Sequence, residues 1–337
     1  MIVTLTGAFK NAGDYLIGHR ARSLLAAHVD SDIININRKE IREEHYDVFN
    51  RARAVMLTGG PAYQAKIYPG IYPIDLARIE VPVIPFGLGW KGQLDQAPAD
   101  FTFTEPSRDF IQTVHQRLAG SSSVRDHLTK QLLQHNGIDN VMMTGCPAWY
   151  DESRIAHDFV YPNKIKKVVL SMPAFPHQQV WDLMDATSSL FPGATKYLAF
   201  QAGYKSTHVK NQSEYTAWNY KTIRRGVLKG FRPISFDSNF SKFETFMSSV
   251  DFHFGYRVHS HIFSLSQRIP SMLIAEDSRG VGQAEAMGVS PRMASAPSSE
   301  VISALRELVD TRGAEVSTAI ETMRSTHSTM LSFLAQV

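Results

Sequence analysis

The segment Phe254–His261, with the sequence FGYRVHSH, gathers the residue types best suited to chemistry. It places Arg257, His259 and His261 within five residues, directly after an apolar run that ends at Gly255. Arginine binds phosphate and carboxylate groups through two parallel hydrogen bonds, and histidine exchanges protons near neutral pH. The segment therefore predicts an anionic substrate and a proton transfer, with Arg257 and His259 as first candidates and His261 as the second.

The elements around this segment follow a strand, turn, helix, strand order. The strand that ends at Gly255 leads into a turn and an apolar helix, and a second strand, Ile269–Ala275, precedes the charged turn 276–279. In parallel α/β sheets, functional groups lie at the carboxyl ends of strands and the amino ends of helices. Asp277 and Arg279 are thus predicted either to line the same pocket or to form a structural ion pair.

The same alternation of strands and helices extends over all 337 residues. It predicts an α/β protein with two Rossmann-like, doubly wound domains that face a cleft. A charged, less periodic stretch near residues 150–167 marks the boundary, so we expect domains at 1–160 and 161–312. The last helix, within 313–337, is long enough to pack back towards the first domain. A helix is also expected over Ser123–His135, with Ser123 as its N-cap.

Composition is that of an ordinary globular protein, with 43% hydrophobic and 20% charged residues and a net charge of +3. The start of the chain, Met1–Gly7, predicts a strand instead of a signal peptide, and no apolar run is long enough to span a membrane. Cys146 is the only cysteine, which excludes an intrachain disulfide and fits a reducing cytoplasm. We interpret Cys146 as a small buried residue.

Residues 196–232 carry eight basic residues against one acidic residue, a net charge of +7, together with five tyrosine and tryptophan side chains. One interpretation is a solvated helical face with a loop. The other is a surface for an anionic partner, either a phosphorylated carrier or the headgroups at the inner face of a membrane. Lys205, in this segment, is a candidate for the wall of the cleft. No nucleic-acid partner is expected, because no recognised binding motif accompanies the charge.

Further candidates lie in turns after strands or at helix starts, where backbone N–H groups approach a ligand. Each has a structural alternative: a helix cap for Asp14, tight turns for the glycines and an internal ion pair for Arg125. No metal site is expected near the histidines, because no carboxylate or cysteine is spaced to complete one. The chain also lacks a nucleophile elbow, a P-loop and a full dinucleotide fingerprint. These further candidates are Asn11, Gly13, Asp14, Gly59, Gly60 and Arg125.

Taken in order, several of these turns resemble the landmarks of the polysaccharide pyruvyl transferase family. The resemblance implies a GT-B-like fold and the transfer of a group from phosphoenolpyruvate to two hydroxyls of a sugar, which forms a pyruvate ketal without a further cofactor. It implies His259 as the general acid/base, Arg257 as a donor contact and Arg125 as a further ligand contact. Arg279 and His261, which are candidates from their own positions, are the remaining residues expected to bind the donor. The segments that carry it are Asn11–Asp14, Thr58–Gly60, Ser123–Asp126, Gly145–Pro147, Gly255–His259 and Asp277–Arg279.

The family's acceptors are sugars of cell-surface polysaccharides, often on lipid-linked intermediates. Within that scheme the domain 1–160 is expected to hold the acceptor and 161–312 the donor. Two alternatives stay open at this level. One is a metal-independent GT-B glycosyltransferase with a nucleotide-sugar donor, and the other is a non-catalytic protein that binds sugars or a membrane surface.

Overall fold

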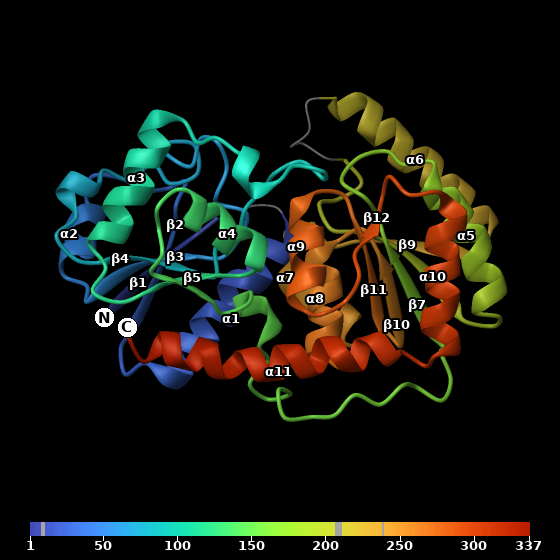
Figure 1. Cartoon of the computed structure of the whole chain (residues 1–337). Coiled ribbons are helices and arrows are strands. Elements are labelled where there is room, and N and C mark those ends of the chain that lie inside the picture. The colour runs from blue at the N-terminus through green and yellow to red at the C-terminus, as the bar shows by residue number, and fades with distance from the viewer. Residues whose placement is uncertain (8–10, 206–210, 238) are drawn as a thin grey trace.

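The computed structural model describes residues 1–7, 11–205, 211–237 and 239–337. It contains two larger parallel sheets, at the left and the right of Figure 1, with α1, α7 and α8 between them. Strands of buried β-branched and aliphatic residues, without polar alternation, are typical of parallel sheets covered on both faces. The α/β class predicted from the alternating pattern is therefore confirmed.

The first sheet has the strand order β2-β1-β3-β4, with every pair parallel. A parallel pair, β5-β6, continues beyond β4 through a bridge between Leu88 and Val124. The strands are β1 (Ile2–Thr6), β2 (Ile33–Asn37), β3 (Ala54–Thr58), β4 (Val83–Phe86), β5 (Ser122–Val124) and β6 (Val141–Met143). The helices of this half are α1 (Ala12–His28), α2 (His45–Asn50), α3 (Glu105–Gln116) and α4 (His127–His135).

The second sheet has the order β12-β11-β10-β7-β8-β9, again parallel throughout. Its strands are β7 (Lys167–Ser171), β8 (Thr195–Phe200), β9 (Phe231–Ser235), β10 (Phe252–Gly255), β11 (Ser271–Ala275) and β12 (Arg292–Met293). The helices that follow β7 in the chain are α5 (Gln179–Leu190), α6 (Gln212–Leu228), α7 (Phe240–Met247), α8 (Val258–Ser266), α9 (Ser278–Ala286), α10 (Ser298–Asp310) and α11 (Ala314–Leu334).

The last helix, α11, runs along the bottom of the molecule in Figure 1 and joins the two halves. It contacts α8 of the second half and β6 of the first, and near its end Phe333 stacks on Phe86 of β4, with 5.6 Å between the ring centroids. A single buried apolar cluster includes residues of α1, β10, α8 and α11. The two halves are consequently packed together by a shared core. None of the helices in the described ranges is long and apolar enough to cross a bilayer.

One predicted element is wrong. The stretch from Ser123 was expected to be helical, but Ser122–Val124 forms β5, and α4 begins only at His127. The helix cap is Asp126, whose carboxylate accepts hydrogen bonds from the backbone N–H and the hydroxyl of Thr129 at 2.7 and 2.6 Å. A three-residue strand is too short for its period to be recognised in the sequence. The correction places Arg125 in the link between β5 and α4.

Candidate functional site

His259 lies where the two halves meet, in the first turn of α8. Its side chain is buried, and Nε2 has no hydrogen-bond partner among the described residues. A buried, unpaired polar atom in a native fold calls for an explanation, and a ligand is one. His259 also lines a pocket together with Asn11 from the first half and with Gln201, Arg257 and Glu276 from the second.

Gly13, in the first turn of α1, makes the room that this histidine occupies. A methyl group at Gly13 would lie 2.4 Å from Nδ1 of His259 and 2.6 Å from its Cβ, far inside van der Waals contact. Two residues earlier, Asn11 caps α1 by accepting a hydrogen bond from the Gly13 backbone N–H at 3.0 Å. The predicted turn at Asn11–Asp14 thus packs its glycine against the imidazole and brings Asn11 into the pocket.

Three arginines surround His259 in the same pocket: Arg125, Arg257 and Arg279. Arg125 is 1% exposed and donates to the Trp90 carbonyl oxygen and to Asp126, both at 3.2 Å. Arg279 pairs with Asp277 at 2.6 Å. The sequence predicted that Asp277 and Arg279 either line the pocket or form a structural ion pair. The structure shows both, because the two residues form an ion pair that also lines the pocket.

Arg257 differs from the other two arginines in its partners. It is the N-cap residue of α8, and its guanidinium donates to the carbonyl oxygens of Met172 and Pro173 at 2.7 and 2.9 Å. No carboxylate lies within ion-pair distance of it in the described parts of the chain. Its positive charge is therefore held in position at the pocket wall without a carboxylate to neutralise it.

The electrostatic environment keeps the His259 ring neutral. Burial, together with the positive charges of Arg125, Arg279 and Arg257, lowers the pKa of His259 to about 3. The opposite holds for Asp14, since burial raises the pKa of its carboxyl to about 6, while Arg38, Arg279 and Lys39 oppose the shift. The site thus holds an unprotonated imidazole and a carboxyl that titrates near neutral pH, which is the range that acid/base catalysis requires.

A second pocket adjoins the first on the side of the four-stranded sheet. It lies at the carboxyl ends of β1 and β3 and at the start of α1, and its wall includes Asn11, Asp14, Arg38, Gly59, Gly60 and Arg279. Gly59 and Gly60 have φ of 55° and 81°, and a methyl group at Gly59 would lie 1.9 Å from a methyl of Ile17. Only glycine therefore fits at position 59. Asn11 and Arg279 line both pockets, so the two open onto the same boundary.

Two of the predicted site residues lie elsewhere. His261 is rotated away from the cleft, because two residues along a helix turn a side chain by about 200°. Its Nδ1 lies 2.7 Å from the Ser271 hydroxyl, and it lines a separate small cavity. Lys205 is exposed and lines neither pocket of the cleft. The interpretation of Cys146 as a buried residue is confirmed, and burial raises the pKa of its thiol to about 11.

Sequence reasoning missed three residues of the site. Gln201, at the end of β8, donates to the Ser260 hydroxyl at 2.5 Å, and Glu276 accepts from the backbone N–H groups of Ala174 and Phe175. Arg38, after β2, lines the second pocket and lies over the Tyr72 ring at 5.1 Å. Their place after a strand was the available signal, because strand ends gather at one edge of a parallel sheet.

The basic segment is largely occupied by contacts within the protein. Lys221 and Arg225 lie over the Trp181 ring at 4.8 and 4.7 Å, and Lys229 pairs with Asp185. These contacts favour the solvated-face interpretation for that part of α6. Arg224, Val227 and Leu228 are exposed on the same helix. Lys210, which belonged to the predicted basic segment, lies outside the described residues.

Comparison with known proteins gives a family and a fold. The family model described as polysaccharide pyruvyl transferase matches residues 11–278. The match includes every residue of the first pocket except Arg279, and every residue of the second except Thr6, Gly7 and Arg279. No curated protein sequence matches the chain significantly.

Solved structures resemble the whole chain at low sequence identity. They include Anabaena HepE in complex with UDP and glucose (12% identity, 100% of this chain and 99% of that chain, TM-score 0.56). Staphylococcus aureus MnaA with UDP has 11% identity, 100% and 97% coverage and a TM-score of 0.59. The UDP-GlcNAc 2-epimerase of Neisseria meningitidis has 10% identity, full coverage of both chains and a TM-score of 0.57. The predicted GT-B-like fold is confirmed by this likeness.

Proposed function

The chain belongs to the polysaccharide pyruvyl transferase family, and from this membership we propose that it transfers a pyruvyl group from phosphoenolpyruvate to two hydroxyls of a sugar. The sugar belongs to a cell-surface polysaccharide or to its lipid-linked precursor. The observation that carries the proposal is the neutral His259, with an unpaired buried Nε2, surrounded by three arginines. That arrangement suits a substrate that carries two anionic groups and needs a proton carrier.

The donor fits the charges of the pocket. Phosphoenolpyruvate has a phosphate and a carboxylate, and guanidinium groups bind each through paired hydrogen bonds. Arg257 has no carboxylate partner in the described residues, so binding an anion satisfies it without breaking an ion pair. Arg125 and Arg279 are held by Asp126 and Asp277 and add positive potential from fixed positions. In this proposal the donor lies on the side of the six-stranded sheet.

His259 performs the first proton transfer in this scheme. One sugar hydroxyl adds to C2 of the enol, its proton passes to His259, and His259 returns a proton to the methylene carbon, which becomes the methyl group. Bound phosphate and carboxylate offset the three arginines, and their negative charge raises the pKa of His259 from its value in the free enzyme. Donor binding thereby makes the imidazole a better base for deprotonating the sugar hydroxyl.

The second hydroxyl closes the ketal. Its oxygen bonds to C2, the bond between C2 and the phosphate oxygen breaks, and inorganic phosphate leaves. Asp14 accepts the second proton, since its pKa of about 6 leaves it mostly ionised at neutral pH but able to take up a proton. It lies in the second pocket, beside Gly59 and Gly60, where the acceptor sugar is placed in this proposal. Donor and acceptor would then meet at Asn11 and Arg279.

A nucleotide-sugar glycosyltransferase is the second candidate, because the similar structures of HepE and MnaA contain UDP. Release of inorganic phosphate from phosphoenolpyruvate, measured with polysaccharide fragments as acceptors, separates the two candidates. Phosphate release that requires both the acceptor and His259 supports pyruvyl transfer. Thermal stabilisation by UDP-sugars alone, with no phosphate release from phosphoenolpyruvate, refutes it.

A lipid-linked acceptor would bring the enzyme to the inner face of a membrane. We assign that contact to the exposed end of α6, where Val227 and Leu228 lie next to Arg224. Sedimentation with vesicles that contain anionic lipid tests it. Binding that is lost in Val227→Ser/Leu228→Ser supports the contact, and sedimentation equal to that with neutral vesicles refutes it.

A further inference from the structure

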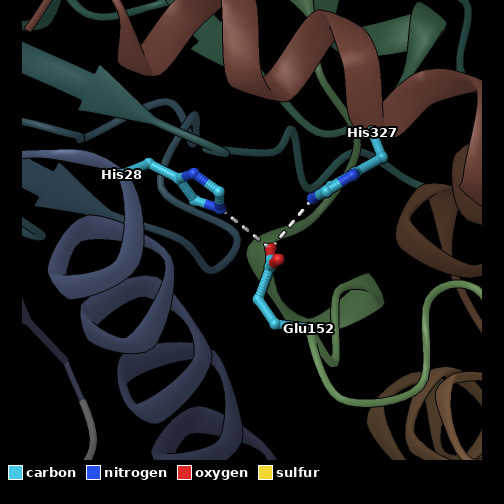
Figure 2. Close-up of side chains that lie close together, drawn as sticks. All are labelled: His28, Glu152 and His327. Atoms are coloured by element: carbon cyan, nitrogen blue, oxygen red, sulfur yellow. Dashed lines mark hydrogen bonds and ion pairs between the residues drawn. The ribbon is translucent and has the colours of Figure 1, made fainter.

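Two histidines and a glutamate from three distant parts of the chain converge on the underside of the molecule. His28 is the last residue of α1, Glu152 follows the short helix η3 (Pro147–Trp149), and His327 lies in α11. Figure 2 shows both imidazoles directed at the same carboxylate oxygen. His327 Nε2 lies 2.9 Å from Oε1 of Glu152, and His28 Nε2 lies 3.4 Å from it.

This cluster is separate from the cleft. The cleft lies at the first turn of α1 and His28 at the last residue, so the helix places about 24 Å between them at 1.5 Å per residue. Solvent reaches all three groups, since their side chains are 30%, 33% and 14% exposed in chain order. The catalytic scheme above uses none of them.

The spacing fits a first-row transition metal. Zinc bonds to nitrogen and carboxylate oxygen at about 2.0–2.1 Å, so two ligand atoms of a tetrahedral site lie about 3.3–3.4 Å apart. The distance from His28 Nε2 to Oε1, 3.4 Å, equals this edge length, the distance from His327 Nε2, 2.9 Å, is shorter, and all three ligand atoms lie within 4.8 Å of one another. A metal ion at the centre would therefore require small side-chain movements and no backbone movement.

The surroundings hold the ligands in place. The neighbour of Glu152, Asp151, pairs with Arg20 of α1 at 2.6 Å and accepts a hydrogen bond from Gln267. The His327 ring packs on Tyr150, with 5.0 Å between the centroids. Two ligands thus lie next to buried, ordered groups. A metal site gains affinity from such positioning, because less freedom is lost on binding.

We propose that His28, Glu152 and His327 bind one late first-row divalent cation, with Zn²⁺ as the first choice, and that the ion fastens α11 to α1 and to the segment after η3. Two imidazoles and one carboxylate favour Zn²⁺, Ni²⁺ or Cu²⁺ over Mg²⁺ and Ca²⁺, which prefer oxygen ligands. Water completes the coordination. The role is structural, because the ion would join residues that are 124 and 175 positions apart in the sequence.

The test uses the full chain without an affinity tag, stripped of metal with EDTA and dialysed. Titration calorimetry with Zn²⁺ is expected to give one site per chain. With free Zn²⁺ at a hundred times its Kd, the midpoint temperature of thermal unfolding is expected to rise by about 4 °C. Mg²⁺ is expected to give neither effect. Hydrogen exchange is expected to slow in α11 when Zn²⁺ is added.

The variants His28→Ala, Glu152→Gln and His327→Ala should each weaken Zn²⁺ binding at least tenfold. His135→Ala is the matched control, because His135 is an exposed histidine at the last residue of α4, as His28 is in α1. It should bind Zn²⁺ like the wild type. Failure of the wild type to bind Zn²⁺ in the micromolar range overturns the proposal. Unchanged Zn²⁺ affinity in all three variants also overturns it, and the cluster is then a hydrogen-bonded contact only.

Discussion

His259 and His261 are two residues apart in α8 and belong to different regions of the molecule. Both are buried, and the pKa of each is lowered to about 3, chiefly by burial. Each also has an Nε2 atom without a partner in the described residues. By burial and pKa alone the two histidines are nearly identical, although the first lines the cleft and the second contacts β11 of the second sheet.

The difference lies in what surrounds each ring. The His259 pocket contains Arg125, Arg257 and Arg279, and their charges add to the lowering of its pKa. No such charge acts on His261. It contacts the Ser271 hydroxyl at 2.7 Å. It also lines a cavity of about 20 Å³, room for about one water molecule, whose wall is mostly apolar but includes Arg292 and Glu315.

The environment of His261 continues as a chain of hydrogen bonds through the sheet. Ser271 also lies 2.7 Å from Nδ1 of His253, and Nε2 of His253 lies 3.0 Å from the Ser171 hydroxyl. The chain connects α8 with β11, β10 and β7. A lowered histidine pKa therefore reports burial in both regions, and only the converging arginines around an open pocket distinguish a site that binds an anion.

The largest effect should come from His259→Ala. Because this variant removes the proposed acid/base, phosphate release from phosphoenolpyruvate with acceptor present should fall about 10²–10⁴-fold. The fold should persist, as measured by circular dichroism, since His259 makes no hydrogen bond through Nε2. Turnover within threefold of the wild type would remove His259 from the mechanism and show that it is, like His261, a buried histidine without a catalytic role.

Gly13→Ala tests whether the cleft depends on the exact position of His259. The added methyl would lie 2.4 Å from Nδ1 of His259, so the ring must shift. A shift of about 1 Å costs about 10²-fold in turnover. Activity is again measured as phosphate release.

The double variant Gly13→Ala/His259→Ala is the control. Without the imidazole the methyl has space, so the double variant should be no less active than His259→Ala alone. Strictly multiplicative losses would show that Gly13 acts independently of His259.

Arg257→Lys should have a smaller effect, mainly on the donor. Lysine retains the charge but lacks the planar guanidinium that donates to Met172 and Pro173 while lining the pocket. The KM for phosphoenolpyruvate should rise about tenfold, the worth of one charged hydrogen bond, while kcat changes less. An unchanged donor KM in steady-state kinetics would contradict the assignment of Arg257.

The sequence predicted the α/β class, most strand positions and the residue pair Arg257 and His259, because these depend on local patterns. It ranked His259 before His261 but kept His261 as a donor residue, since the rotation that takes His261 out of the cleft depends on where α8 begins. It misplaced the helix start at Ser123, and it had no means of bringing together His28, Glu152 and His327. Contacts between residues more than a hundred positions apart depend on the packing of α11, which no local spacing encodes.

The smallest effect on activity should come from His261→Asn, with turnover within about threefold of the wild type, and its acid stability should be the informative measurement. The folded pKa of His261, about 3, lies below the ordinary value of 6.5, so the unfolded chain binds more protons between pH 6.5 and 3. Stability is therefore lost as the pH falls through that window, by about 2–3 kcal/mol per histidine at pH 4.5.

Removing His261 eliminates one such loss. Loss of its hydrogen bond to Ser271 lowers the free energy of unfolding by about 1 kcal/mol at pH 7. The variant should therefore be less stable than the wild type at neutral pH and more stable at pH 4.5. Circular dichroism during acid titration measures the midpoint. His259→Ala should shift that midpoint in the same direction, because its pKa is lowered equally. The two histidines would then agree in acid stability and differ in catalysis, whereas a large loss of turnover in His261→Asn would place the buried network within the active site.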